Sequence, residues 1–328
     1  MTRYVLLFAF LLPLILMSAG CKGRSKGVPK RAKKQAQKKE FSVIPSARKR
    51  TRPPTKQLEA AKKTYAKYGL KYTGITDYLP SFSGVLHDSA DKSLEGLPDL
   101  PFPYQLRFGS SGLTDKGLKH LRGLKNLTSL NLFNKNVSDA GLSNLKKLHY
   151  LEKLNLKHTH VSDEGLVHLS ALTNLVSLDL HDTQVKGAGL VFLQKLNSLE
   201  WLDLGNTKLT DWGLLQLKKL KNLKHLYLHS TQVTDDGLVY LKELKNLESL
   251  SLSETNVTNE GLKHLQGLKT LKYLGIYRTK VSDSGLVYLR ELKNLKSLEI
   301  QEIQVTKSGV DALKKHLPKC YIYHSELE

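Results

Sequence analysis

Residues 161–184 read VSDEGLVHLSALTNLVSLDLHDTQ, and the pattern of this stretch returns every 24 residues along most of the chain. Valine opens seven such units and leucine opens two more: Val137, Val161, Val185, Val233, Val257, Val281 and Val305, with Leu113 and Leu209. Self-similarity at a fixed period indicates one supersecondary unit stacked on itself. The sequence therefore predicts a solenoid with a long open surface.

The first half of the unit has the period of a helix. Leu166, Leu169 and Leu172 are spaced by three residues, which is typical of the buried stripe of a short helix. Ser162 and Asp163 precede this stripe, where a hydroxyl can cap free backbone N–H groups and an acid suits the helix dipole. We therefore expect a short helix in each unit.

The second half has the period of a strand, because Leu178 and Leu180 alternate with polar residues. A strand and a short helix in 24 residues, with the Leu-x-x-Leu-x-Leu core that begins at Leu175, resembles the leucine-rich repeat. The same core recurs at Leu151, Leu199, Leu223 and Leu247. The resemblance implies an α/β leucine-rich repeat solenoid, or horseshoe, with a parallel β-sheet on its concave face and short helices on its convex face.

Threonine stands where the leucine-rich repeat family has asparagine or cysteine, at Thr159, Thr183, Thr207, Thr231, Thr255 and Thr279. This pattern resembles a Thr-type variant in bacterial repeat proteins, and the Ser/Thr-Asp-x-Gly-Leu opening resembles the repeats of eukaryotic F-box proteins. No F-box-like helical segment is evident, so the resemblance does not imply ubiquitin ligation. We expect the threonine hydroxyls to be buried and to bond backbone groups of the adjacent turn.

The period reaches beyond the clear units. Shifting it back by 24 residues gives a degenerate unit at 89–112, with apolar residues at Leu94, Leu97, Leu100, Leu106 and Phe108. We therefore expect about ten units in 89–328. The last unit slips by one residue at Leu317 and is predicted to form a C-terminal cap, in which Cys320 is a buried, inert thiol.

Residues 57–88 are predicted to form an N-terminal cap. A helix is expected over Gln57–Tyr68, because Leu58, Ala61 and Tyr65 lie on one of its faces. Without a cap, the first unit would leave an apolar end and an unpaired strand edge in water.

Residues 1–20 have the pattern of an export signal peptide. Arg3 supplies a charge, Tyr4–Met17 is an apolar run, and small residues precede Cys21. Ser-Ala-Gly-Cys resembles a bacterial lipoprotein lipobox, although Ser18 stands where that family usually has leucine. The resemblance implies acylation of Cys21 and a membrane-anchored protein of the cell envelope, periplasmic or at the cell surface. Cleavage without acylation and a retained anchor are the alternatives.

Positive charge is concentrated in the segment that follows. The 328 residues include 51 Lys and Arg against 30 Asp and Glu, a net charge of +21, and 18 basic but only two acidic residues fall within 22–72. Residues 21–56 also contain four prolines and little apolar surface, so we expect a disordered basic linker. The alternative is a contact with polyanions: acidic lipid, wall polymer or nucleic acid. Nucleic acid is the least expected of these, because aromatic residues for base stacking are almost absent.

Outward strand positions form three columns across the predicted concave face. Aromatic, histidine and aspartate residues converge on the units that start at 161, 185 and 209; we call this set the concave patch, and it comprises Trp201, Tyr227, His181, His225, His229, Asp179 and Asp203. Exposed Trp and Tyr are enriched at binding hot spots, so a protein or peptide ligand is expected here. Tyr273 and Tyr277 form a second, weaker patch. Neutral drift on a surface that needs only polarity is the alternative.

Asp179 and Asp203 are expected on neighbouring strands, about 4.8 Å apart. Two carboxylates at such a short distance raise the pKa of one of them or attract a cation. With His181 nearby a metal site is an alternative, but an open sheet provides no second shell, so a basic peptide is preferred and no metal site is predicted. Neither catalytic residues nor a cofactor are predicted, because no enclosing loops and no nucleophile motif are visible. The chain is therefore not expected to be an enzyme.

Overall fold

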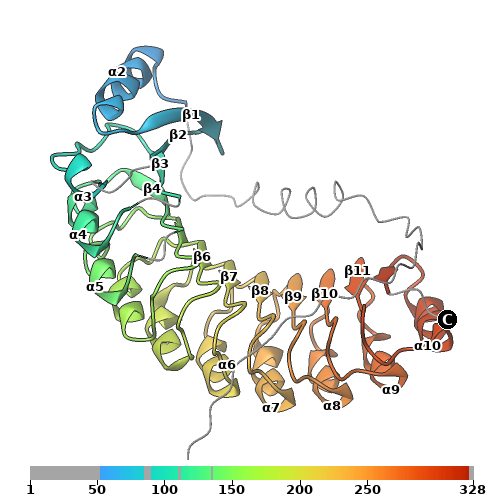
Figure 1. Ribbon diagram of the computed structural model, residues 1–328. Coiled ribbons are helices and arrows are strands. Elements are labelled where there is room, and N and C mark those ends of the chain that lie inside the picture. The colour runs from blue at the N-terminus through green and yellow to red at the C-terminus, as the bar shows by residue number, and fades with distance from the viewer. Residues whose placement is uncertain (1–51, 85–89, 110–111, 134–135, 325–328) are drawn as a thin grey trace, which may run out of the picture. The chain divides into compact units, whose positions relative to one another are not determined.

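The computed structural model describes residues 52–84, 90–109, 112–133 and 136–324. The predicted signal peptide, Cys21 and nearly all of the predicted linker lie outside the described residues. Within those ranges the strands form one 12-stranded sheet whose order follows the sequence (Figure 1). Its strands are β1 (Lys71–Thr76), β2 (Leu79–Ser83), β3 (Tyr104–Arg107), β4 (Leu127–Asn131), β5 (Lys153–Asn155), β6 (Ser177–Asp179), β7 (Trp201–Asp203), β8 (His225–Tyr227), β9 (Ser249–Ser251), β10 (Tyr273–Gly275), β11 (Ser297–Glu299) and β12 (Tyr321–Tyr323).

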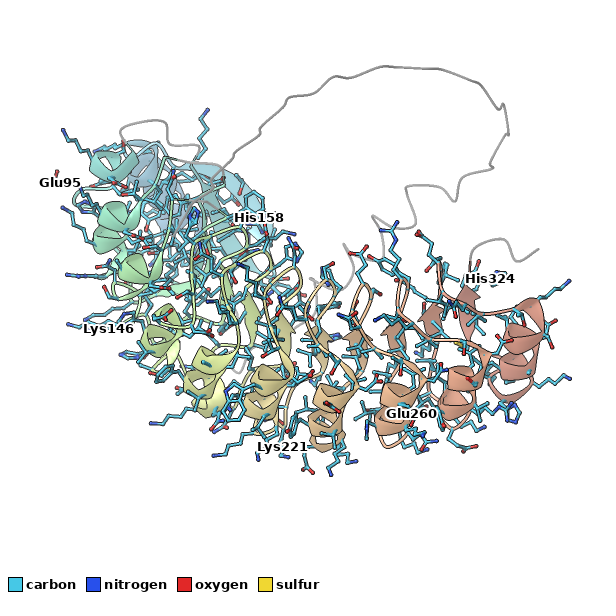
Figure 2. All side chains as sticks on the ribbon, turned by 60° about the horizontal axis from the view of Figure 1, so that its bottom comes forward. Glu95, Lys146, His158, Lys221, Glu260 and His324 are labelled. Carbon is cyan, nitrogen blue, oxygen red and sulfur yellow. The ribbon has the colours of Figure 1, made fainter. Side chains whose placement is uncertain are left out.

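Short helices follow the strands on the outer side of the sheet (Figure 1). The α-helices are α2 (Thr55–Ala66), α3 (Ala90–Ser93), α4 (Asp115–Leu118), α5 (Asp139–Leu142), α6 (Asp211–Leu217), α7 (Asp235–Leu238), α8 (Asn259–Leu262), α9 (Asp283–Leu286) and α10 (Lys307–His316). The 3-10 helices are η1 (Lys119–Leu121), η2 (Gly165–Leu169), η3 (Ala188–Lys195), η4 (Val239–Glu243), η5 (Lys263–Leu265) and η6 (Val287–Leu289). Charged side chains such as Lys146, Lys221 and Glu260 project from this outer side (Figure 2). Among the described residues, no helix has both the length and the apolar character needed to cross a membrane.

The register of the sheet follows the 24-residue period. Leu154 pairs with Leu178 and Leu178 with Leu202, and each pair of adjacent strands from β2–β3 to β11–β12 is parallel. The predicted α/β solenoid with a parallel sheet is therefore confirmed. The same register already holds where Ser81 of β2 pairs with Gln105, so the period extends further towards the N-terminus than the sequence indicated.

Stacked leucines form one continuous core between the sheet and the helices. Leu154, Leu178 and Leu202 are at most 1% exposed, and so are Leu166 and Leu169 of the helical layer. Burying one leucine contributes about 1.5–3 kcal/mol. A typical hydrogen bond contributes about 1 kcal/mol net, so leucine stacking dominates the stability of each repeat.

The N-terminal end of the sheet is covered by α2 and an antiparallel hairpin of β1 and β2. The face of α2 with Leu58, Ala61 and Tyr65 is buried, as predicted, although the helix begins at Thr55, inside the predicted linker. The Tyr65 ring lies 4.8 Å from the ring of Phe82, centroid to centroid. The hairpin was not predicted from the sequence.

Both ends of the predicted repeat array bury apolar residues at the positions that the 24-residue period gives. Its degenerate first unit has buried apolar residues at Leu94, Leu97, Leu100, Leu106 and Phe108. At the other end α10 and β12 close the array, and Cys320 beside β12 is 7% exposed. Burial, which the sequence predicted, raises the pKa of the Cys320 thiol to about 11 and favours its protonated form at neutral pH.

The threonine column is buried and hydrogen-bonded to the backbone, as the sequence predicts, but its bonds do not reach the adjacent turn. The six hydroxyls are buried and donate to a backbone carbonyl three residues earlier, at oxygen–oxygen distances of 2.5–2.7 Å. Thr183, for example, donates to Leu180. The accepting carbonyl belongs to the same repeat, so these bonds close each turn on itself instead of linking repeats.

Aspartates at the starts of the helices link neighbouring repeats, a role that was not predicted from the sequence. Asp139 accepts the backbone N–H of Ser162 at 2.8 Å and the Ser162 hydroxyl at 2.6 Å. Equivalent pairs join Thr114 to Asp91, Ser138 to Asp115, Thr234 to Asp211, Thr258 to Asp235 and Thr306 to Asp283. A methyl group at Gly165 would overlap the Asp139 carboxylate. The Ser/Thr-Asp-x-Gly sequence is therefore an interlock between neighbouring repeats.

This interlock is broken once within the described residues, where Gly187 replaces aspartate. The N-cap residue Gly187 has no side chain to cap η3, and the Asp163 carboxylate of the preceding repeat accepts the backbone N–H groups of Gly187 and Gly189. Gly187 has a φ of +121°, a conformation that L side chains rarely adopt. With no carboxylate at this position, the Thr210 backbone N–H donates to the Lys186 carbonyl at 3.3 Å.

The interlock predicts different effects for two substitutions of Asp235. Asp235→Ala removes two hydrogen bonds and leaves the Thr258 N–H without its acceptor, so we expect a loss of about 1–3 kcal/mol in the free energy of unfolding. Asp235→Asn should cost less than about 1 kcal/mol, because Asn259 already fills this position in the next repeat and bonds both Ser282 groups. Urea unfolding monitored by circular dichroism measures both. Equal losses for the two variants would contradict the interlock.

Candidate functional site on the concave face

The concave patch lies on three neighbouring strands, β6, β7 and β8, and on the residues that follow them. The register pairs Asp179 with Asp203 and Trp201 with His225. The structure therefore brings the predicted residues together. Tyr273 and Tyr277 lie in and just after β10, two strands beyond β8, and form a separate patch on the same sheet.

Trp201 is not exposed, contrary to the expectation from its outward strand position. Only 7% of the residue is accessible. Its ring packs on that of Tyr227 with centroids 5.6 Å apart. Neighbouring strands stand about 4.8 Å apart, so large side chains on an inward-curving sheet cover one another. Tyr273 is 41% exposed and is the most accessible of the predicted aromatic residues.

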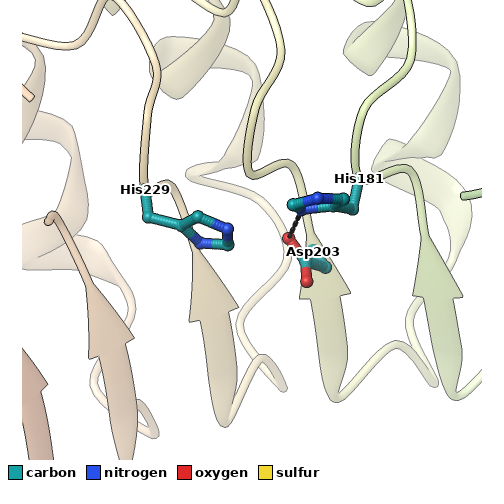
Figure 3. A group of neighbouring side chains, drawn as sticks. All are labelled: His181, Asp203 and His229. Carbon is teal, nitrogen blue, oxygen red and sulfur yellow. Dashed lines mark ion pairs between the residues drawn. The ribbon is translucent and has the colours of Figure 1, made fainter. Parts of the chain in front are cut away.

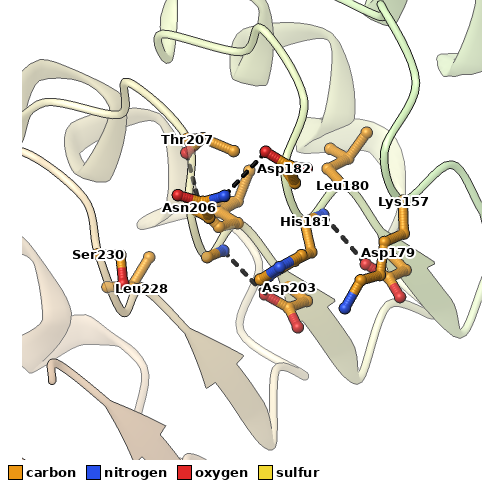
Figure 4. A network of polar contacts seen from close by, with 12 residues as sticks. Lys157, Asp179, Leu180, His181, Asp182, Asp203, Asn206, Thr207, Leu228 and Ser230 are labelled. Carbon is orange, nitrogen blue, oxygen red and sulfur yellow. Dashed lines mark hydrogen bonds and ion pairs between the residues drawn. The ribbon is translucent and has the colours of Figure 1, made fainter. Parts of the chain in front are cut away.

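The two aspartates are held at defined positions by hydrogen bonds, of which Figure 4 shows those from backbone donors. Asp179 accepts the backbone N–H of His181 at 3.0 Å and the Asn155 side-chain amide at 3.0 Å. Asp203 accepts the backbone N–H of Gly205 at 2.8 Å. Both oxygens of Asp179 are therefore engaged, whereas these bonds use only Oδ1 of Asp203.

Burial makes both carboxyl groups weaker acids. Desolvation, followed by the charge of Asp203, raises the pKa of Asp179 to about 7. Desolvation also raises the pKa of Asp203 to about 6, although nearby Lys157 acts in the opposite direction. The pair consequently carries less negative charge near neutral pH than its sequence suggests.

Two histidines from different repeats meet above Asp203 (Figure 3). The rings of His181 and His229 lie 5.2 Å apart, centroid to centroid, and His181 Nδ1 is 3.9 Å from Asp203 Oδ1. Burial, with the charge of Lys157, lowers the pKa of His181 to about 4 and that of His229 below its ordinary value. Both imidazoles are therefore neutral at pH 7.

Gly205 explains how side chains two repeats apart come into contact. It occupies the strand position between His181 and His229, and a methyl group there would overlap the His229 ring. The sequence places His181 and His229 in the same patch. The contact between the two rings depends on the missing side chain and was not predicted.

His158 extends this row and was not identified from the sequence. Its ring contacts those of Phe133 and His181, with centroids 4.7 and 5.7 Å away, and it pairs with Asp182. Its φ is positive, as at the equivalent positions Asp182, Asn206, Ser230, Glu254, Arg278 and Glu302. The alternation of strand side chains does not continue through a residue with a left-handed backbone conformation, so it could not place His158 on the concave face. No glycine marks these positions in the sequence. His158 thus lies beside the concave patch, in contact with the ring of His181.

Comparison with known proteins supports the fold. Models of leucine-rich repeats match residues 147–170 and 243–265, and a two-copy repeat model matches 197–240. Together with the strand-and-helix unit of 24 residues, these matches define the structure as a leucine-rich repeat solenoid. No curated protein matches the chain.

Solved structures with similar architecture include two internalins from Listeria monocytogenes. Internalin C2 is 24% identical with a TM-score of 0.49, over 81% of this chain and 92% of that chain. The internalin inlF is 18% identical with a TM-score of 0.47, over 82% and 91%. The plant peptide hormone receptor RGFR1, solved in complex with RGF2, is 19% identical with a TM-score of 0.45, over 78% and 36%.

The raised pKa of Asp203 predicts pH-dependent stability. The Asp203 carboxyl group holds its proton more tightly in the folded chain than in the unfolded chain. The free energy of unfolding therefore falls as the pH rises from 3.8 through about 6. Asp203→Asn has no charge to bury and keeps an acceptor for Gly205. We expect it to be more stable than the wild type at pH 8, on the order of 1–3 kcal/mol, with a smaller gain as the pH falls towards 4.

Urea unfolding across this pH range, in buffer with a chelator, measures the effect. Asp236→Asn, at an exposed acid on the outer side, is the control and should show no comparable gain. A gain for Asp203→Asn that does not change with pH would contradict the assignment.

Proposed function

We propose that this chain is an exported, lipid-anchored leucine-rich repeat protein that binds a protein or peptide through its concave face. In this proposal residues 1–20 are the signal peptide, 21–56 the linker, 57–88 the N-terminal cap and 89–328 the ligand-binding repeats. Leucine-rich repeat proteins are generally binding scaffolds, and solenoids present extended concave surfaces to their ligands. Neither a catalytic role nor a cofactor is part of the proposal.

The observation that carries the proposal is the exposed aromatic surface of the sheet. Tyr273 of β10 is 41% exposed, and half-buried Tyr277 and Tyr227 lie on the same side of the solenoid. Tyrosine supplies a large contact area with a polar tip and is enriched at binding hot spots. The raised pKa values of Asp179 and Asp203 reduce the attraction for a basic peptide. Aromatic contacts are therefore the preferred basis of recognition.

Tyr273→Ala should abolish ligand binding with little change in stability, because the side chain already lies largely in solvent. Tyr150→Ala is a matched control, since Tyr150 is also 41% exposed but lies in the turn before β5, outside the strand columns. Immobilised wild-type chain and the two variants would capture proteins from a cell-envelope extract, identified by mass spectrometry. Proteins retained by the wild type and Tyr150→Ala but lost with Tyr273→Ala support the proposal. Identical capture by all three would refute it.

Lipid anchoring rests on Cys21, which lies outside the described residues. We expect the mature chain to begin at Cys21 and to carry acyl groups there, as mass spectrometry of its N-terminal peptide can show. Cys21→Ser should move the protein from the membrane fraction to the soluble fraction, because each buried CH₂ of an acyl chain contributes about 0.8 kcal/mol. A chain that still begins at Met1, or is cleaved without acylation, would contradict the anchor.

Polyanion binding is the second candidate, and the 18 basic residues in 22–72 favour it. Deleting residues 22–51 removes most of this charge and retains α2, which begins at Thr55. The two candidates then differ in a measurable way. Under the main proposal, capture through the concave face survives the deletion and only binding to anionic vesicles decreases. If all capture disappears while the circular dichroism spectrum is unchanged, the basic segment is the binding element.

A further inference from the structure

Three side chains from successive repeats direct metal-binding atoms towards one point above β7 (Figure 3). The ligand atoms of His181, Asp203 and His229 all lie within 4.8 Å of one another. Donor atoms around a tetrahedral Zn²⁺ stand roughly 3.3 Å apart, given bond lengths of about 2.0–2.2 Å. Side-chain rotations that move these atoms by about 1 Å would therefore complete the geometry.

We propose that His181, Asp203 and His229 form a binding site for a divalent transition-metal ion, with Zn²⁺ as the best fit. Two imidazoles and one carboxylate are a donor set that suits Zn²⁺ and its neighbours in the first transition row, in preference to Ca²⁺ or Mg²⁺. Three protein ligands leave the remaining coordination positions to water or to another molecule. The proposal reverses the expectation from the sequence that the concave face holds no metal, and it does not rest on the proposed function.

The site has the surrounding support that an open sheet was expected to lack. Asp179 accepts the backbone N–H of His181, and Gly205 donates its N–H to Asp203 Oδ1. The first contact fixes the backbone that carries His181, and the second orients the Asp203 carboxylate from outside the coordination sphere. Asp179 does not belong to this group: among the described residues, the ligand atoms that lie within 4.8 Å of one another are those of His181, Asp203 and His229.

The third ligand, His229, is available because of Gly205. Strands two repeats apart are separated by about 9.6 Å, too far for two imidazoles to share an ion without leaning towards each other. His229 leans over Gly205 and brings its ring to 5.2 Å from His181, centroid to centroid. Within the described residues, neither ring nitrogen of His229 makes a hydrogen bond to a protein group, so both remain open to a ligand.

Zinc binding to the untagged full chain tests the ligand set. After treatment with a chelator, titration with Zn²⁺ against a chromophoric competitor should show one site in the wild type. His181→Ala, His229→Ala and Asp203→Asn should each weaken its affinity at least tenfold. His264→Ala is the matched control, because His264 is half-buried on the outer helical side and its loss should change nothing.

Gly205→Ala tests the geometry without removing a ligand. The new methyl group displaces the His229 ring, so Zn²⁺ affinity should fall at least tenfold while the melting temperature in chelator stays close to that of the wild type. Gly123→Ala, where an added methyl group meets no atom within 4 Å, controls for the effect of alanine on the chain.

Two further measurements distinguish a preformed metal site from weak binding of Zn²⁺ at the surface. Zn²⁺ should raise the melting temperature of the wild type but not of the ligand variants, and Co²⁺ should give a visible absorption spectrum that these variants lose. The proposal is overturned if the wild type binds no Zn²⁺ at micromolar concentration. It is also overturned if the three ligand variants bind Zn²⁺ as tightly as the wild type.

Discussion

Parallel stacking in a register of 24 residues is the constraint on which every other feature of this chain depends. Each buried leucine lies beside the leucine of the next repeat, as Leu154, Leu178 and Leu202 do, so sheet hydrogen bonding and core burial are satisfied together. Because one face of each strand is buried, the register cannot slip by a single residue. The same constraint aligns outward residues 24 positions apart, which is why Asp179 lies beside Asp203.

The two sides of the solenoid are irregular in the same region. On the outer side the aspartate interlock is interrupted at Gly187, and on the inner side Gly205 of the same repeat gives space to His229. The neighbouring repeats supply His181 and His229, so the departures from the pattern gather on three adjacent strands. A regular scaffold thus holds the irregular residues rigidly, and these residues determine what the surface can bind.

The inward curve of the sheet changes the chemistry of the residues on it. It buries Trp201 against Tyr227 and shifts the pKa of Asp179 towards neutrality. Aromatic contacts are consequently better provided by Tyr273, further along the sheet. The concave face therefore divides into a half-buried polar cluster suited to a small cation and an exposed aromatic region suited to a macromolecule.

From the sequence alone one can predict the repeat, the buried leucines, the burial of the threonine column and the residues that share the concave face. These follow from the 24-residue period and the alternation of strand side chains, which are properties of one repeat. Four features follow from the tertiary structure alone: Trp201 is buried, Ser162 bonds Asp139, His158 reaches the patch through a positive φ, and His181 contacts His229. These features depend on strand spacing, curvature and the space beside Gly205, which arise only between repeats.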